Sequence, residues 1–308
     1  MRKKKIFELQ SLYRENLVIE GYEFGEGSLG ACIMGSLRGN EVQQLYVCSQ
    51  IVKTLKEIEA TTPEKIRKKV MVVPSGNHYS LNIGERFWVC DHTDINRMFP
   101  GYNEGETVQR IADGLFKGIK DYPYGLQFTS NYVAGDYIPH IRIMKTGLED
   151  IEDAKKFGMP YVVIREPRPY DTTTLNYNWQ IWDTNAFSIY TGVTDTIDDE
   201  KAKLAFNAVM HFLNEKGIVE YDAEQAYTSL VINDDDLISI QTTRAGLFNF
   251  VCLTGDEVKC GDVLARVYDP FEGYLLEEIK APCDGFIFFH HNKPMVYAKT
   301  IAFKMIAE

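Results

Sequence analysis

Several features that would place this chain in a particular class are missing from its sequence. No apolar run approaches the roughly 20 residues of a membrane-spanning helix. The basic residues 2–5 could open a secretory signal, but Glu8, Gln10 and Glu15 occupy the positions of its apolar core. The six cysteines include no C-x-x-C pair, and scattered cysteines are typical of a reduced protein. We therefore expect a cytoplasmic protein without a membrane anchor.

A basic surface is missing as well. The chain has 33 Lys and Arg against 44 Asp and Glu, for a net charge of −11, and beyond residues 2–5 the cations are dispersed. This excludes nucleic acid as an expected partner. The hydrophobic share of 45% and charged share of 25% are typical of a soluble globular protein, and a length of 308 residues favours two domains.

Apolar runs of strand length alternate with helical patterns over the first two thirds of the chain. Helical spacing predicts helices at residues 41–60, 107–120, 148–157 and 198–216. The predicted strands are residues 17–22, 31–37, 70–74, 124–129, 140–144, 161–165 and 187–190. This alternation predicts an α/β domain with a mixed or parallel sheet over residues 1–225.

The remaining residues, 226–308, have short predicted strands separated by Gly-Asp turns, the clearest at residues 254–262. Residues 281–286 echo residues 244–248, which suggests an internal repeat. We predict a small all-β module that resembles the barrel-sandwich of biotinyl and lipoyl carriers. Neither Lys259 nor Lys293 has the sequence context of a carrier lysine, so the module is interpreted as structural.

The most informative stretch is CDHTDINRMFPG at residues 90–101, because DxxDINRxFPG is too mixed chemically to follow from packing alone. The guanidinium of Arg97 can offer two parallel N–H donors to a carboxylate, which predicts an anionic ligand. A surface ion pair of Asp94 with Arg97 in a Pro-Gly turn is the plainer alternative. The stretch resembles the DxxDLNRxFPG signature of the aspartoacylase and succinylglutamate desuccinylase family, which is related to the zinc carboxypeptidases.

This resemblance implies a carboxypeptidase-like mixed sheet with flanking helices and a C-terminal all-β barrel-sandwich module. It also implies substrate-binding roles for Asp94, Asn96 and Arg97. Arg142, in the sequence Pro139-His140-Ile141-Arg142, matches a PHxR element whose arginine contributes to substrate binding in the family.

The family's metal ligands are mostly replaced. The HxxE motif that opens its metal site corresponds to Arg38 and Glu41, and the histidine of a later strand corresponds to Gln127. Arginine has no lone pair to donate and its charge repels Zn²⁺, while a Gln carbonyl is a weak zinc ligand. Glu41 is therefore the only matched ligand, and we expect an Arg38–Glu41 ion pair in place of the metal. Gly125 replaces an aspartate that would orient a ligand.

Tyr190 occupies the position of the family's catalytic glutamate, in the strand predicted at residues 187–190. A phenol is a poor general base, although it can donate a hydrogen bond. Glu166, Asp183 and Asp195 are other acids that a different geometry could supply.

The leading hypothesis is a pocket for a small carboxylate or N-acyl amino acid that has lost conventional zinc hydrolysis. One alternative is an active amide hydrolase or acyl transferase with a remodelled site, using a hard cation at Glu41 and Gln127 or no metal. Another is a non-catalytic subunit of an active partner. We expect no cofactor, or zinc if the replacements leave the site functional. The expected partner is a small anionic amino-acid-derived ligand, and a homo-oligomer stays open.

Two further features have plain interpretations. Adjacent His290 and His291 in a strand point to opposite faces and cannot easily share an ion, so we interpret them as surface residues. Four aromatic residues in a polar loop before the strand at residues 187–190 either line a binding cleft or pack in the core: Tyr170, Tyr177, Trp179 and Trp182.

Overall fold

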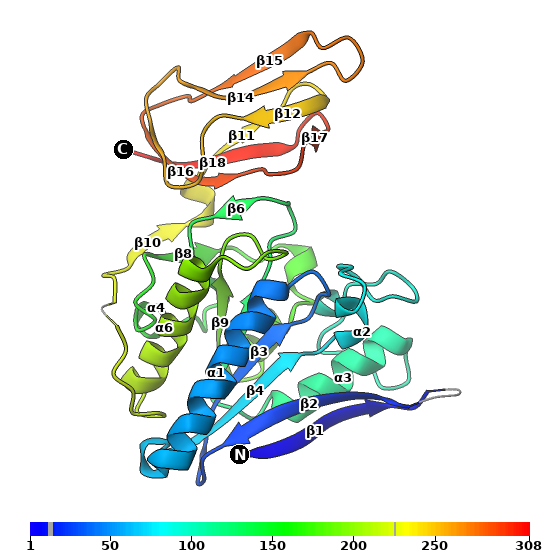
Figure 1. Cartoon of the computed structure of the whole chain (residues 1–308), viewed down its shortest axis with the longest axis vertical. Helices are drawn as coiled ribbons and strands as arrows, with labels where there is room; N and C mark the ends of the chain where they lie inside the picture. Colours follow the sequence, from blue (N-terminus) through cyan, green and yellow to red (C-terminus); the bar gives the residue numbers. More distant parts are fainter. Residues whose placement is uncertain (12–14, 225) are drawn as a thin grey trace. The chain divides into compact units, whose positions relative to one another are not determined.

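The structure is a computed structural model that describes residues 1–11, 15–224 and 226–308. The chain divides into two compact units (Figure 1), the first of residues 1–129 and 139–231 and the second of residues 130–138 and 232–308. The sequence places the boundary after residue 225 and gives no sign that residues 130–138 belong to the second unit. No helix in the described ranges is long and apolar enough to cross a membrane.

The first unit is built on a mixed sheet in the strand order β1-β2-β4-β3-β5-β9-β7-β8-β10. Its strands are β1 (Arg2–Leu9), β2 (Leu17–Phe24), β3 (Leu29–Ser36), β4 (Lys69–Ser75), β5 (Tyr124–Thr129), β7 (His140–Met144), β8 (Tyr161–Arg165), β9 (Asn185–Tyr190) and β10 (Leu230–Asn233). Strands β4, β3, β5 and β9 run parallel, and β7 runs antiparallel to β9. The expected carboxypeptidase-like α/β fold is confirmed.

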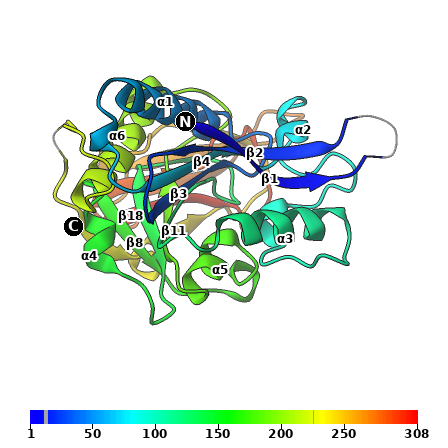
Figure 2. The same ribbon diagram turned by 90° about the horizontal axis from the view of Figure 1, so that it is seen from below.

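Helices cover both faces of this sheet. They are α1 (Val42–Thr61), α2 (His78–Leu81), α3 (Thr107–Ile119), α4 (Ile151–Lys155), α5 (Leu175–Ile181) and α6 (Asp199–Glu215), with 3-10 turns η1 (Pro63–Lys65), η2 (Ile95–Arg97) and η3 (Pro169–Asp171). Figure 2 shows α1 and α6 on one side and α3 and α5 on the other. Each pair of helices closes its own apolar core against the sheet.

The predicted elements of the first unit match the structure closely, and three strands have the predicted limits. Four of its described helices and strands escaped prediction, namely β1, α2, α5 and β10. β1 carries Arg2, Lys3, Lys4 and Lys5 on an exposed edge strand, where charge is common, so the run looks like a basic tail. The segment before β9 is not a polar loop, because it contains the short helix α5. Leu175 and Trp179 are a single pair of buried apolar residues at helical spacing, so the sequence shows only a weak helical pattern.

The second unit is all-β, as the sequence predicts. One sheet has the order β11-β18-β16-β13, with β6 also on β16, and the other has the order β15-β14-β12-β17. The bounds are β6 (Asp136–Tyr137), β11 (Ile238–Gln241), β12 (Gly246–Phe250), β13 (Glu257–Val258), β14 (Val263–Tyr268), β15 (Leu275–Lys280), β16 (Gly285–His290), β17 (Met295–Val296) and β18 (Ile301–Ala307), with the 3-10 turn η4 (Asp234–Asp236). Apolar side chains from both sheets form one core.

The interpretation of His290 and His291 as surface residues is wrong. Both are buried, at 5% and 6% exposure. His290 Nδ1 lies 2.8 Å from the hydroxyl of Thr254, and the His291 ring packs edge-on against Phe248 at 5.5 Å between centroids. Burial lowers the pKa of His291 because the charged ring is poorly solvated there.

Candidate functional site

Gln127, Ser188 and Arg142 occupy directly adjacent positions on β5, β9 and β7, so their side chains share one face of the sheet. On its other side Gln127 pairs with Met34, which belongs to the core under α3 and α5. Gln127 and Ser188 lie near the carboxyl ends of parallel strands. This is where open α/β sheets bind ligands.

Arg38 follows the carboxyl end of β3 and lies between two carboxylates. Its Nη1 donates to Glu41 Oε1 at 3.1 Å, and its Nε and Nη2 donate to Asp94 at 3.1 and 2.9 Å. The Arg38 and Glu41 side chains are 3% and 1% exposed, so both charges are removed from water. The expected Arg38–Glu41 ion pair is confirmed. Asp94 is a second partner that the sequence pattern does not reveal.

The paired charges of Arg38 and Asp94 favour each other's ionised form. Burial raises the pKa of the Asp94 carboxyl, but the Arg38 guanidinium outweighs it, and the net pKa lies below its usual range. Arg86 is also close enough to act electrostatically on Arg38, Glu41 and Asp94. Burial and the neighbouring Arg38 charge lower the pKa of Arg86 to about 10. The result is a cluster of two cations and two anions in which Arg38 and Glu41 are buried and Asp94 and Arg86 are partly buried.

The residues at the family's metal position do not fit a catalytic zinc. Glu41, the matched ligand, accepts hydrogen bonds from the backbone N–H groups of Leu37 and Arg38 with Oε2 and from the Arg38 guanidinium with Oε1. Both of its oxygens are engaged. In the described part of the chain, no cluster of three or more His, Cys, Asp or Glu side chains could hold a metal ion. A catalytic zinc needs three protein ligands and an open position.

Asn96 ties the signature loop to the sheet. Its Oδ1 accepts from Gln127 Nε2 at 3.2 Å and from the backbone N–H of Leu175 at 3.1 Å. Asp94 caps the turn η2 by accepting from the N–H of Asn96. The loop closes at Gly101, where a Cβ would lie 2.0 Å from the backbone nitrogen of Asp113 and only glycine fits. The signature therefore positions Asn96 beside Gln127.

Arg97 lies against the turn η3. Its Nη1 donates to the carbonyl of Tyr170 and lies 3.6 Å from the carboxylate of Asp171. Asp171 also accepts from Arg165 Nε at 3.1 Å, and its side chain is 6% exposed. The simple Asp94–Arg97 ion pair, the plainer interpretation of the signature, is therefore wrong, because each residue pairs elsewhere. Asp171 was not predicted, and nothing in the local sequence marks it.

Arg142 is buried with 5% exposure and contacts Tyr190. Its Nη1 donates to the Tyr190 hydroxyl at 2.8 Å, and its Cζ lies 4.1 Å from the ring centroid. The His140 ring stacks on Tyr190 at 4.7 Å. Within the described residues, Arg142 pairs with no carboxylate and its Nε has no hydrogen-bond partner. Arg142 contacts Tyr190 whereas Arg97 contacts Tyr170 and Asp171, so the convergence of the two arginines on one ligand stays a prediction.

Trp179 occupies the space beside Gly125. It is fully buried, and a Cβ at position 125 would lie 2.5 Å from its Cε3 atom. Of the two interpretations of Trp179, packing is confirmed. The place of an orienting aspartate at this position is filled by an indole ring.

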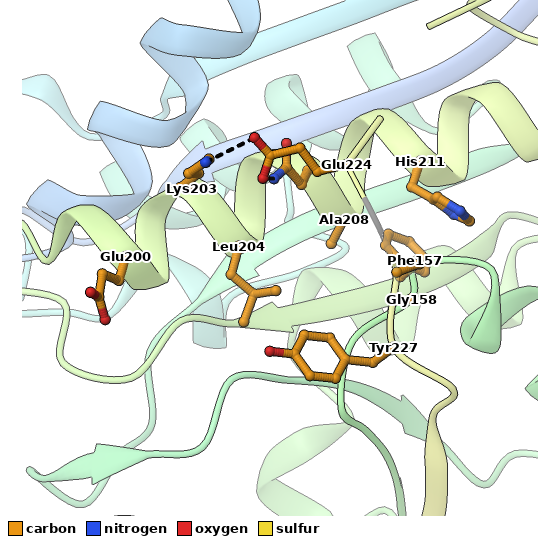
Figure 3. A pocket seen from close by; sticks show the side chains of 11 residues that line it. Phe157, Gly158, Glu200, Lys203, Leu204, Ala208, His211, Glu224 and Tyr227 are labelled. Atoms are coloured by element: carbon orange, nitrogen blue, oxygen red, sulfur yellow. Dashed lines mark hydrogen bonds and ion pairs between the residues drawn. The ribbon is translucent and has the colours of Figure 1, made fainter. Parts of the chain in front are cut away.

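A separate hollow of about 240 Å³ lies beside α6 (Figure 3). Leu204, Ala208, Phe157 and Tyr227 are among its lining residues, and Glu224 at its rim pairs with an α6 lysine. None of the predicted site residues lines it. The hollow is not part of the candidate site.

Residues 30–214 match the succinylglutamate desuccinylase/aspartoacylase catalytic domain family. The chain belongs to this family. The resemblance inferred from the signature is therefore confirmed.

Relatives cover most of the chain. It is 25% identical over 280 residues to the N-alpha-acetyl-L-2,4-diaminobutyric acid deacetylase of Halomonas elongata, spanning 85% of this chain and 77% of that protein. The fold is similar to a succinylglutamate desuccinylase/aspartoacylase from Rhodobacter sphaeroides, with a TM-score of 0.81, 19% identity and coverage of 99% and 95% of the two chains. The fold is also similar to the product-bound ectoine utilization protein EutE (DoeB) from Ruegeria pomeroyi. The TM-score is 0.79 and the sequence identity 20%, with coverage of 98% of this chain and 93% of that chain.

Proposed function

We propose that this protein binds a small carboxylate of the N-acyl amino acid type and does not carry out the zinc-dependent hydrolysis of its family. The observation that carries the proposal is the buried Arg142, whose charge has no carboxylate partner in the described part of the chain. A buried cation without a counterion is costly, and an anionic ligand offsets that cost. Arg38 and Arg86, by contrast, already face Glu41 and Asp94.

The loss of hydrolysis rests on the Arg38 triad. The guanidinium supplies a fixed positive charge next to Glu41, and it occupies the carboxylate oxygens that a metal would need. Tyr190, at the position of the family's general base, accepts a hydrogen bond from Arg142 and is placed to hold this arginine. A site of this kind can bind and orient an anion, and the Tyr190 phenol is a poor general base for activating water.

A binding experiment tests the ligand class. Calorimetric titration of wild-type protein with N-acetyl-L-aspartate, N-acetyl-L-glutamate and N-succinyl-L-glutamate is compared with the Arg142→Met variant. A charge-assisted hydrogen bond contributes roughly 1.5 to 3 kcal/mol, so the variant should bind about one to two decades more weakly. Equal affinity in both proteins, or no binding to either, contradicts the proposal.

An active deacylase is the second candidate, because a deacetylase of N-alpha-acetyl-L-2,4-diaminobutyric acid is similar over most of the chain. Elemental analysis after dialysis, together with a chelator-sensitive deacylase assay on the same acetylated amino acids, separates the two functions. We expect substoichiometric zinc and no chelator-sensitive activity. Stoichiometric zinc in the wild-type protein makes the remodelled deacylase the better interpretation.

A further inference from the structure

Two contacts define the direction in which helix α5 runs over the sheet. Its first residue, Leu175, donates to Asn96 Oδ1, the atom that also accepts from Gln127. One turn later, Trp179 packs on Gly125. The helix therefore runs from the level of Gln127 toward the level of Gly125, antiparallel to β5 and β9 and parallel to β7.

The side of α5 that carries Gln180 faces β7. Gln180 Nε2 donates to the carbonyl of Met144 at 2.9 Å. Asn176 lies one helical turn before Gln180, about 6 Å along the axis, and Arg142 lies two residues before Met144, a similar distance along the strand of about 6.6 Å. Because the helix and strand run in the same direction, Asn176 is at the level of Arg142.

Asn176, like Arg142, is buried and has side-chain polar atoms without a hydrogen-bond partner among the described residues. Its side chain is 2% exposed, and among the described residues neither its Oδ1 nor its Nδ2 has a hydrogen-bond partner. A buried carboxamide without hydrogen bonds is rare in native proteins, and such a group points to a missing water or ligand. Two such side chains, from different elements, thus lie at one level over the sheet.

We propose that Asn176 is a ligand-specificity residue that recognises the amide of an N-acyl amino acid while Arg142 binds its carboxylate. This inference rests on the proposed function and names the chemistry that the site selects. The Oδ1 atom accepts from the N–H of the acylamide, and the Nδ2 donates to the acyl or carboxylate oxygen. A free carboxylic acid or an ester cannot satisfy both atoms of the carboxamide.

The test compares two probes that differ at one position. N-acetyl-L-aspartate and O-acetyl-L-malate share both carboxylates and the acetyl group, but the malate ester replaces the N–H by an oxygen. Wild-type protein should bind the amide at least about ten-fold more tightly, since the ester leaves Oδ1 of Asn176 unsatisfied. Calorimetric titration measures both affinities and their ratio.

The Asn176→Leu variant replaces the carboxamide by an apolar group of similar volume. It should bind the amide about ten-fold more weakly and lose the preference over the ester. Its Tm should be equal to or higher than that of wild type, because a buried polar group without partners is removed. A merely structural asparagine would instead lower the Tm and leave the ratio of the two affinities unchanged.

Two further variants keep the outcomes distinct. Asn176→Asp has the same shape and places a carboxylate opposite Arg142, so it should weaken both probes, and wild-type affinity in this variant overturns the inference. Arg142→Met should weaken both probes alike. If Arg142→Met weakens binding but Asn176→Leu leaves the amide-to-ester affinity ratio unchanged, the inference about Asn176 is overturned while the proposed function stands. Failure of wild type to bind either probe overturns the proposed function and the inference with it.

Discussion

The indole of Trp179 stands where a side chain at position 125 would have to be, with 2.5 Å between its Cε3 atom and a Cβ built on Gly125. The glycine is thus a packing requirement of α5. The proposed correspondence of positions 38 and 127 to the family's metal-binding histidines implies that histidines at both positions would not be sufficient for a metal site, because Trp179 leaves no room for an orienting aspartate at position 125.

We expect Gly125→Ala to destabilise the protein by about 1–3 kcal/mol, the usual range for overpacking a filled core. Urea denaturation measures the change in the free energy of unfolding. Trp179→Leu should lower stability by itself, and the double variant should be more stable than the sum of the single effects predicts. Strictly additive effects would show that the two positions do not compete for space.

Arg38→Ala should cost about 3–5 kcal/mol of stability, because it leaves the Glu41 and Asp94 carboxylates buried without their shared counterion. Chemical denaturation at neutral pH measures the loss. Lys145→Ala is the matched control, since it breaks the exposed ion pair with Glu166 and should change stability little. Similar small losses in both variants would mean that the triad is solvated.

Acid should reduce the advantage of wild type over an Arg38→Met variant. The pKa of Asp94 is lowered in the folded state, so its pairing stabilises the protein fully above the ordinary value of about 3.9. The contribution is lost as the pH falls through the lower folded pKa. Denaturation curves between pH 7 and the acid limit of folding should show a constant gap that closes only below about pH 4. A gap that closes nearer neutrality contradicts this assignment.

Asp171 should compete with an anionic ligand for Arg97, because its carboxylate lies 3.6 Å from the guanidinium. If Arg97 contacts the ligand, as the signature predicts, Asp171→Asn should bind N-acetyl-L-aspartate about three- to ten-fold more tightly, and Arg97→Ala about one to two decades more weakly. Calorimetry on both variants measures this. Unchanged affinity in Arg97→Ala would leave the arginine a purely structural partner of Asp171.

The fold was predictable because its buried elements follow simple periods. The strands β5, β7 and β8 are continuous apolar or alternating runs whose limits match the predicted ones. Elements that break these periods were missed, as with the charged edge strand β1. Burial of His290 and His291 was also missed, since adjacent residues face two different packed surfaces of the second unit.

The site was predictable only where its chemistry is local. Arg38 and Glu41 are three residues apart, so their ion pair follows from the sequence. The Arg38–Asp94 and Arg97–Asp171 contacts join segments more than 50 residues apart. No sequence period encodes such pairs, so a partner distant along the chain leaves no signal in a single sequence. Asn176 was invisible for the same reason.

Residues 130–138 give the second unit a second covalent tie to the first. They connect the end of β5 to the start of β7, the strands that hold Gln127 and Arg142, and their strand β6 is hydrogen-bonded to β16. The second unit is therefore connected to the first by more than one segment of the chain. The chain crosses between the two units three times, and two of these crossings directly adjoin the strands that carry Gln127 and Arg142.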